Sequence, residues 1–150
     1  MDWMLEGLLQ GTQFQKLYNR KIEDLRREYN LRKVDIDILY FLSKSGEHNT
    51  SKDISDLNLF NKGHISQSVG RMVKQQLIYI VQDQGDRRCM HIMLTEKAEK
   101  IVAEITTLRM QMYNIILKGV TKEERDVLFQ VSQKVNENIK EALENIGTSL

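Results

Sequence analysis

The sequence predicts a mainly α-helical fold in which one β-hairpin interrupts a series of helices. Three observations predict this class. Apolar residues recur at helical spacing through most of the chain, short β-prone runs occur within residues 78–94, and there is no proline to break a long helix. Because no repeat or Gly/Ser-rich linker divides the 150 residues, we expect a single domain, 1–150.

The first part of the chain predicts two helices. Apolar side chains from Met4 to Tyr29 fall close to helical spacing, which predicts one long helix over residues 3–29. A second helix is expected over residues 33–43, where apolar side chains share one face. Residues 46–49, which include a glycine and an asparagine, predict the turn that follows.

Two short helices at the centre of the chain are marked by their capping residues. Thr50 is the N-cap of the first, with Asp53 at its third helical position. Asn61 is the N-cap of the second, which extends to about Gln75. The buried side of this second helix is expected to consist of Ile65, Val69, Met72 and Val73.

A hairpin and two helices complete the predicted order. Residues 78–81 and 89–94 are β-prone and flank a polar, glycine-containing loop at 83–88, as the two strands of a hairpin do. Two helices follow, and the residues that bound them are Thr95, Gly119 and the capping box of Thr121 and Glu124.

The composition is that of a soluble globular protein, with 41% hydrophobic and 29% charged residues. No apolar run approaches the roughly 20 residues that a membrane span needs, and no signal-peptide pattern opens the chain. A single cysteine, Cys89, cannot form an internal disulfide, which fits a reducing compartment. We therefore expect a cytoplasmic protein with no membrane partner.

Basic residues are concentrated at the centre of the chain. Residues 61–91 contain five bases and two acids, whereas residues 121–150 contain four bases and six acids. This distribution indicates a local anion-binding surface. No phosphate-binding glycine loop or G-x-S-x-G motif is present, so we expect neither catalytic residues nor a cofactor.

The central order of helix, turn, helix and hairpin is that of a winged helix-turn-helix over residues 33–94. In this motif the second helix enters the major groove of DNA. Rotation by about 100° per residue predicts its outer face, Gly63, His64, Gln67, Arg71 and Lys74. The same face also fits any solvated amphipathic helix. The residues of this helix that we assign to DNA contact are Asn61, Lys62, Gly63, His64, Ser66, Gln67, Arg71 and Lys74.

The chemistry of these side chains fits base and phosphate recognition. The Gln67 amide can form two hydrogen bonds with adenine, and the Arg71 guanidinium can bind guanine or phosphate through two N–H groups. The Lys74 ammonium can contact the phosphate backbone of DNA. At the hairpin tip, Arg87 and Arg88 can reach a minor groove of enhanced negative potential. Asp86 is unfavourable beside phosphates unless it orients a neighbouring guanidinium, so we include it in the predicted site.

These residues resemble the MarR family of bacterial regulators. The run Gly85-Asp86-Arg87-Arg88, followed by Leu94-Thr95, is similar to the family's D-x-R wing signature and to the L-T that begins its next helix. The run from Asn61 to Val69 is similar to the family's recognition helix, and the helix order matches over essentially all 150 residues. Gln76 and Ala98 depart from the family, which often has glycine at both positions.

The resemblance implies a sequence-specific transcription regulator and not an enzyme. Arg88 would be the wing arginine that enters the minor groove, and Asp86 its orienting partner. Helices over residues 1–30 and 95–147 would form a homodimer, which would repress from a near-palindromic operator in double-stranded DNA and be released by a small ligand. A winged-helix module that binds protein remains the alternative.

Two further interpretations concern small molecules and metals. Many MarR relatives bind an aromatic effector, for which the pocket here would be lined by Phe14, Tyr18, Tyr40, Phe41 and Met112. We favour the alternative, that these five residues belong to the core or the dimer seam. Cys89 and His91 share a strand face, but no second pair at zinc-site spacing accompanies them, so no metal site is predicted.

Cys89 also allows a redox interpretation. It follows two arginines, Arg87 and Arg88, which would lower its pKa if the thiol were exposed. The alternative, which we favour, is that Cys89 fills a small gap in a strand.

Overall fold

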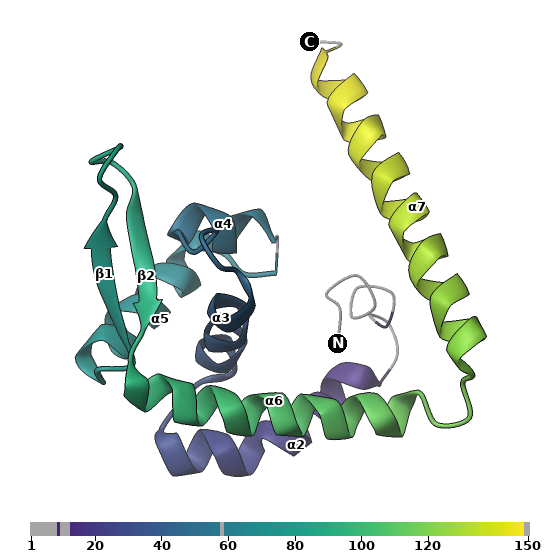
Figure 1. Cartoon of the computed structure of the whole chain (residues 1–150), viewed down its shortest axis with the longest axis horizontal. Coiled ribbons are helices and arrows are strands. Elements are labelled where there is room, and N and C mark those ends of the chain that lie inside the picture. The colour runs from purple at the N-terminus through teal and green to yellow at the C-terminus, as the bar shows by residue number, and fades with distance from the viewer. Residues whose placement is uncertain (1–8, 10–12, 58, 149–150) are drawn as a thin grey trace. The chain divides into compact units, whose positions relative to one another are not determined.

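The computed structural model describes residues 9, 13–57 and 59–148 (Figure 1). Its described part contains six helices and a two-stranded antiparallel hairpin, so the mainly α class is confirmed. The elements in order are α2 (Phe14–Tyr29), α3 (Lys33–Lys44), α4 (Ser51–Asp56), α5 (Lys62–Lys74), β1 (Ile78–Gln82), β2 (Met90–Leu94), α6 (Glu96–Ile116) and α7 (Lys122–Thr148).

The chain divides into two compact units. One contains residues 19–108, which include α3 to β2, and the other contains residues 1–18 and 109–150. The predicted winged helix-turn-helix, residues 33–94, therefore lies wholly within the first of these units. In the described part of the chain, no helix combines the length and apolarity needed to cross a membrane.

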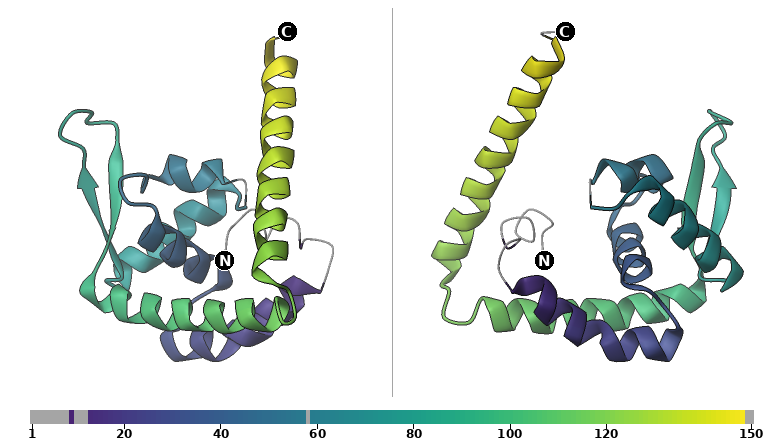
Figure 2. Two further views of the ribbon diagram at one scale, coloured as in Figure 1. Left: turned by 45° about the vertical axis from the view of Figure 1, so that its right-hand side comes forward. Right: turned by 180° about the vertical axis from the view of Figure 1, so that it is seen from behind.

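Helix α3 is the centre of the core of its unit. Every residue from Asp35 to Leu42 is buried, and Ile36, Ile38 and Leu39 have no exposed surface. A helix buried on all sides must be covered by neighbours on all sides. Its neighbours include α5 and β2, and Figures 1 and 2 show α3, α4 and α5 packed together with the hairpin along one side.

The predicted caps are confirmed. Thr50 accepts a hydrogen bond from the backbone N–H of Asp53 at 3.1 Å, and the Asp53 carboxylate accepts one from the Thr50 N–H at 2.9 Å. Asn61 caps α5 by accepting from the His64 N–H at 2.8 Å. Thr121 and Glu124 form the predicted box before α7. Each cap satisfies backbone donors that a helix start leaves without partners.

The prediction of one helix from residue 3 to residue 29 is wrong at its start. Leu9 lies in a turn and α2 begins at Phe14. Glycines at positions 7 and 11 lower the helix propensity of this stretch by about 1 kcal/mol each relative to alanine. Residues 3–8 and 10–12 lie outside the described residues.

The buried side of α5 was predicted wrongly at Val73, and Val69 is only half-buried. Ile65 and Met72 are buried as expected, but Val73 is 41% exposed, and Ser68 is fully buried in its place. Strict apolar periodicity assigns the buried face to hydrophobic residues only, whereas a polar side chain can occupy it when it has a hydrogen-bond partner.

The end of α5 has a left-handed residue. Gln76 has a φ of +60°, and the two hydrogen bonds around it, Leu77 N–H to the Met72 carbonyl and Gln76 N–H to the Val73 carbonyl, are both 3.0 Å. This is the Schellman motif, in which the left-handed position is usually glycine. The structure thus gives the physical reason why a glycine is expected at position 76.

Replacing Gln76 with glycine should stabilise the protein. A left-handed conformation costs a non-glycine residue about 1–2 kcal/mol, while glycine loses about 0.5–1 kcal/mol of extra chain entropy on folding. We expect Gln76→Gly to raise the free energy of unfolding by about 0.5 kcal/mol, measured by urea denaturation. Lys74→Gly, in the right-handed last turn of α5, is the matched control and should lower it by about 1 kcal/mol. Equal destabilisation by both would contradict this account.

Candidate nucleic-acid interface

The exposed face of α5 holds most of the side chains predicted to meet DNA. Lys62, Gly63, His64, Ser66, Gln67 and Lys74 are all exposed, and so is the cap Asn61. The hairpin lies beside α5, and its loop extends beyond α4 in the views of Figures 1 and 2. One unit of the chain therefore presents a helix face and a hairpin tip.

A groove of about 520 Å³ lies between α4 and α5. Ile65 and Val69 contribute its apolar part, while Lys52 and Lys62 bring positive charge. Its other lining residues are Ser51, Ser55, Asp56 and Ser66. Since Lys62 and Ser66 belong to the exposed face of α5, the groove continues that face toward α4.

Arg71 is placed differently from the prediction. Its Nη2 lies 2.7 Å from Oδ1 of Asp35, and its side chain is only 29% exposed. The expected outward position on α5 is therefore wrong for Arg71. The physical reason is a buried carboxylate: Asp35 is 2% exposed, and a buried charge needs a counter-ion.

Asp35 binds three donors on its two oxygens. Oδ2 accepts from the backbone N–H of Arg32 at 2.9 Å, which caps the start of α3. Oδ1 accepts from the Ser68 hydroxyl and from Arg71. We call Asp35, Ser68 and Arg71 the Asp35 cluster; it joins the start of α3 to the middle of α5. Sequence reasoning missed it, although a serine and an arginine three residues apart on one helix are a signal for a shared partner.

The C-terminal end of α5 is held by flanking segments of the same unit. The Gln75 side-chain amide donates to the Asn30 carbonyl at 3.1 Å, and Lys97 Nζ donates to the Gln75 carbonyl at 3.0 Å. The Thr95 hydroxyl donates to the Gln76 carbonyl at 2.7 Å. These contacts satisfy carbonyls that the last turn of a helix leaves without partners.

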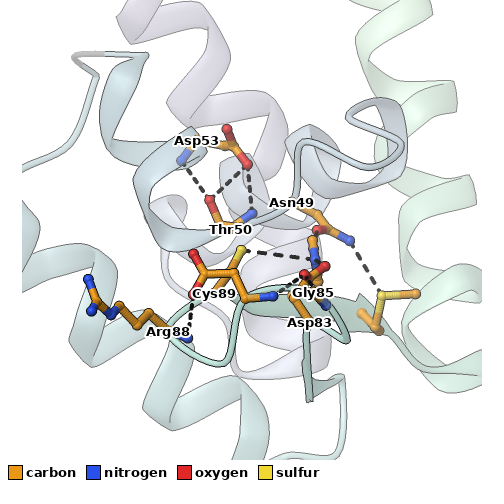
Figure 3. Close-up of polar contacts among 10 residues, drawn as sticks. Asn49, Thr50, Asp53, Asp83, Gly85, Arg88 and Cys89 are labelled. Carbon is orange, nitrogen blue, oxygen red and sulfur yellow. Dashed lines mark hydrogen bonds and ion pairs between the residues drawn. The ribbon is translucent and has the colours of Figure 1, made fainter.

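The hairpin loop is organised by Asp83. Its Oδ2 accepts from the backbone N–H groups of Gly85 and Asp86, both at 2.9 Å, and its Oδ1 lies 2.9 Å from Nε2 of His91 (Figure 3). The other ring nitrogen of His91 is hydrogen-bonded to Oδ1 of Asn49, which is 7% exposed. We call Asn49, Asp83 and His91 the wing latch, because they tie the loop to the turn before α4.

Asp86 orients the backbone of the loop and not a guanidinium. Its Oδ1 accepts from the Arg88 N–H at 2.9 Å, while the side chain of Arg88 points away from this group in Figure 3. The Arg87 carbonyl accepts from the Gln82 amide at 2.8 Å. Asp86 therefore shapes the turn that carries both exposed arginines, and its role as the orienting partner of Arg88 in a DNA complex stays a prediction.

Comparison with known proteins agrees with this geometry. A family model described as a winged helix DNA-binding domain matches residues 21–98, which is more than half of the chain. The chain belongs to this family. The family is one of DNA-binding domains and not of enzymes, as the sequence predicted.

Solved structures of MarR family regulators have the same fold as this winged helix protein. The regulator from Silicibacter pomeroyi matches with a TM-score of 0.73 at 16% identity, over 84% of each chain. The MarR/EmrR family regulator from Acinetobacter sp. ADP1 matches with a TM-score of 0.71 at 19% identity, over 85% of this chain and 89% of that chain. The resemblance to the MarR family is confirmed in the fold.

A DNA complex is among these similar structures. The MepR–DNA complex from S. aureus matches with a TM-score of 0.58 at 18% identity, over 83% of this chain and 93% of that chain.

The residues predicted to line an effector pocket are all buried in this winged helix protein. Tyr40 and Phe41 lie in the unit of residues 19–108, and Phe14, Tyr18 and Met112 lie in the other. Such burial agrees with the interpretation as core residues, which we favoured, and the pocket remains a prediction.

A buried cation, Arg109, lies beside the ring of Tyr18. The rings of Phe14 and Tyr18 are parallel, with centroids 6.2 Å apart, and Arg109 lies 5.7 Å from the centroid of Tyr18. Burial lowers the pKa of Arg109 to about 10, so it stays charged at neutral pH. This cation–π pair was not foreseen, because nothing in the spacing separates a buried arginine from a surface one.

The environment of Cys89 opposes a reactive thiolate. Desolvation raises the pKa of the thiol, and the negative charges of Asp83 and Asp86 raise it further. The interpretation in which Arg87 and Arg88 lower this pKa required an exposed thiol, and it is not met because desolvation is the largest effect on Cys89. Among the described residues, no three His, Cys, Asp or Glu side chains cluster closely enough to hold a metal ion.

The wing latch should make the stability of the hairpin depend on pH. The hydrogen bond from His91 and those from the backbone of Asp86 and Gly85 lower the pKa of Asp83. A lowered pKa means that the ionised carboxylate stabilises the fold above the ordinary value of about 3.9, and that this is lost as pH falls through the lowered value. The difference in unfolding free energy between wild type and Asp83→Asn should therefore shrink between pH 5 and pH 3.

A neutral change in the same loop, Gln84→Asn, is the matched control and should differ from wild type by a constant amount over this range. Hydrogen exchange of the Gly85 and Asp86 amides measures the loop directly. A difference between wild type and Asp83→Asn that grows on acidification would contradict the stabilising role of the carboxylate.

Proposed function

We propose that this winged helix protein is a sequence-specific transcription regulator of MarR type that represses from a near-palindromic operator in double-stranded DNA. One observation carries the proposal: the exposed face of α5 and the arginine-bearing hairpin tip belong to one unit, as a reader of the major groove and its adjacent minor groove requires. The fold shared with the MepR–DNA complex supports it.

The charges around this surface support DNA binding. Lys62, Lys74, Arg87 and Arg88 are exposed. The two acids of the hairpin loop are hydrogen-bonded within it: Asp83 binds His91 and two backbone N–H groups, and Asp86 binds the Arg88 N–H. Asp56, in the groove beside Lys62, is an exposed acid of the same unit. The surface thus offers four exposed cations to a polyanion, which outnumber the nearby carboxylates Asp56, Asp83 and Asp86.

Base reading is assigned to the middle of α5. Gln67 is exposed, and its amide can bind adenine through two hydrogen bonds. Lys62 and Lys74 contact the DNA phosphate backbone on either side of the bases that Gln67 reads. Arg88 enters the minor groove. The role proposed for Arg71 at the sequence level, a direct contact to guanine or phosphate, is withdrawn because of its pairing with Asp35.

The active species is a homodimer in the cytoplasm, and α7 supports this part of the proposal. Along α7 an apolar stripe is 43–64% exposed, more than an isolated soluble helix usually presents to water. Its members are Val127, Val131, Val135, Ile139, Leu143 and Ile146. A second copy of the chain would cover it and place two α5 helices about one DNA turn apart, roughly 34 Å. Release by a small aromatic effector is retained from the family resemblance.

The proposed function is tested by selecting duplexes from a random pool with wild-type protein and measuring binding by fluorescence anisotropy from about 50 to 200 mM salt. We expect specific binding that weakens steeply with salt, through counterion release. Arg88→Ala removes one contact from each subunit of the dimer, so it should weaken binding at least about tenfold and reduce the slope of log K against log salt by about 1.8.

Two controls define this result. Lys100→Ala removes an exposed charge from α6 and should change neither quantity. Gln67→Ala should change the selected sequence more than the slope. Wild-type protein that enriches no sequence and shows no salt dependence would contradict DNA regulation and favour a module that binds protein.

The dimer is tested at the α7 stripe with Ile139→Lys. Burying a lysine in an apolar interface should cost roughly 3 kcal/mol per dimer, or about a hundredfold in the dimer dissociation constant, measured by sedimentation equilibrium. Gln133→Lys adds the same charge on the opposite side of α7 and should leave the dimer intact. A monomeric wild type, or equal effects of the two changes, would contradict this interface.

A further inference from the structure

Arg71 lies where its guanidinium can pair either with Asp35 or with a DNA phosphate. On α5 it stands four residues after Gln67 and three before Lys74, so the three side chains lie along one side of the helix. Gln67 and Lys74 are exposed, whereas the Arg71 side chain is 29% exposed and directed to Asp35. The tip of a long arginine would reach the outer side of α5 if this contact were broken.

The contact has the features of a fixed anchor. The Asp35 carboxylate is 2% exposed, and Arg71 is the cation that the structure places on it. Ser68, on the turn before Arg71, donates to the same oxygen and has no exposed surface. Two donors from one helix on one buried oxygen restrict how α5 can rotate about its own axis.

We propose that Asp35 is a positioning residue of the DNA site: it withholds Arg71 from phosphate and fixes the rotation of α5, so that Gln67 faces the bases. This inference rests on the proposed function. It makes Asp35 a determinant of specificity without any contact to DNA, because the rotation of α5 decides whether Gln67 reaches the bases. The withheld phosphate contact would strengthen binding to every sequence equally and would change only the salt dependence.

The experiment compares Asp35→Asn, Arg71→Met and the double variant on two probes, the duplex selected by wild type and an unrelated duplex. Arg71→Met keeps the apolar stem and removes the charge, so it should leave the salt slope of wild type unchanged. Asp35→Asn should release Arg71 in both subunits and steepen the slope by about 1.8, the value of one phosphate contact per subunit. Its preference for the selected duplex should fall about tenfold, because α5 is no longer held in the rotation that directs Gln67 to the bases.

The double variant Asp35→Asn/Arg71→Met should return to the wild-type slope, which a general loosening of the fold would not do. Ser68→Ala keeps the ion pair but removes one donor to the carboxylate. It should reduce the preference between the duplexes without changing the slope. Circular dichroism and thermal unfolding identify a variant that does not fold, and if Asp35→Asn is one, Arg71→Met and Ser68→Ala decide the question.

The inference is overturned if Arg71→Met reduces the slope as Arg88→Ala does, because Arg71 would then contact phosphate in the complex. It is also overturned if a folded Asp35→Asn keeps the slope and preference of wild type. Failure of the proposed function has a different signature: wild type itself would then not distinguish the two duplexes, and Arg88→Ala would bind as wild type does.

Discussion

The buried carboxylate of Asp35 is the constraint on which the rest of the DNA-binding unit depends. It closes the start of α3, the most buried helix of the unit, and its other oxygen fixes α5 through Ser68 and Arg71. Removing one partner of a buried ion pair costs about 3–5 kcal/mol, which is a large part of the stability of a small domain. One side chain therefore links the stability of the core to the orientation of the exposed helix face.

Much of this fold could be predicted because its signals are local in the sequence. The caps at Thr50, Asn61 and Thr121 each act over three residues, and the structure confirms all three. The hairpin likewise needs only two β-prone runs and a polar loop, and its strands pair as Ile78 with Leu94 through Gln82 with Met90. Features of this kind are set by the backbone of one segment and do not depend on distant neighbours.

What the sequence did not reveal depends on contacts between distant residues. Arg71 and Asp35 are 36 positions apart, and helical periodicity alone assigns an arginine to the outside. Asn49 and His91 are 42 positions apart, so the wing latch was equally invisible. The start of α2 was misjudged for a different reason, because apolar spacing was given more weight than the two glycines that precede Phe14.

The connection between Asn49 and the hairpin has a consequence for the shape of a binding site. The Asn49 carbonyl accepts from the Ile92 N–H at 3.0 Å, and its side chain holds His91. The Asn49 amide also donates to Sδ of Met93 at 3.4 Å. The hairpin and the turn before α4 are thereby joined by three contacts of Asn49, and the hairpin cannot swing away from the helices without breaking all three. The hairpin tip and the exposed face of α5 are then held at a fixed separation. The operator of the proposed function must therefore have a set number of base pairs between the two points that they touch.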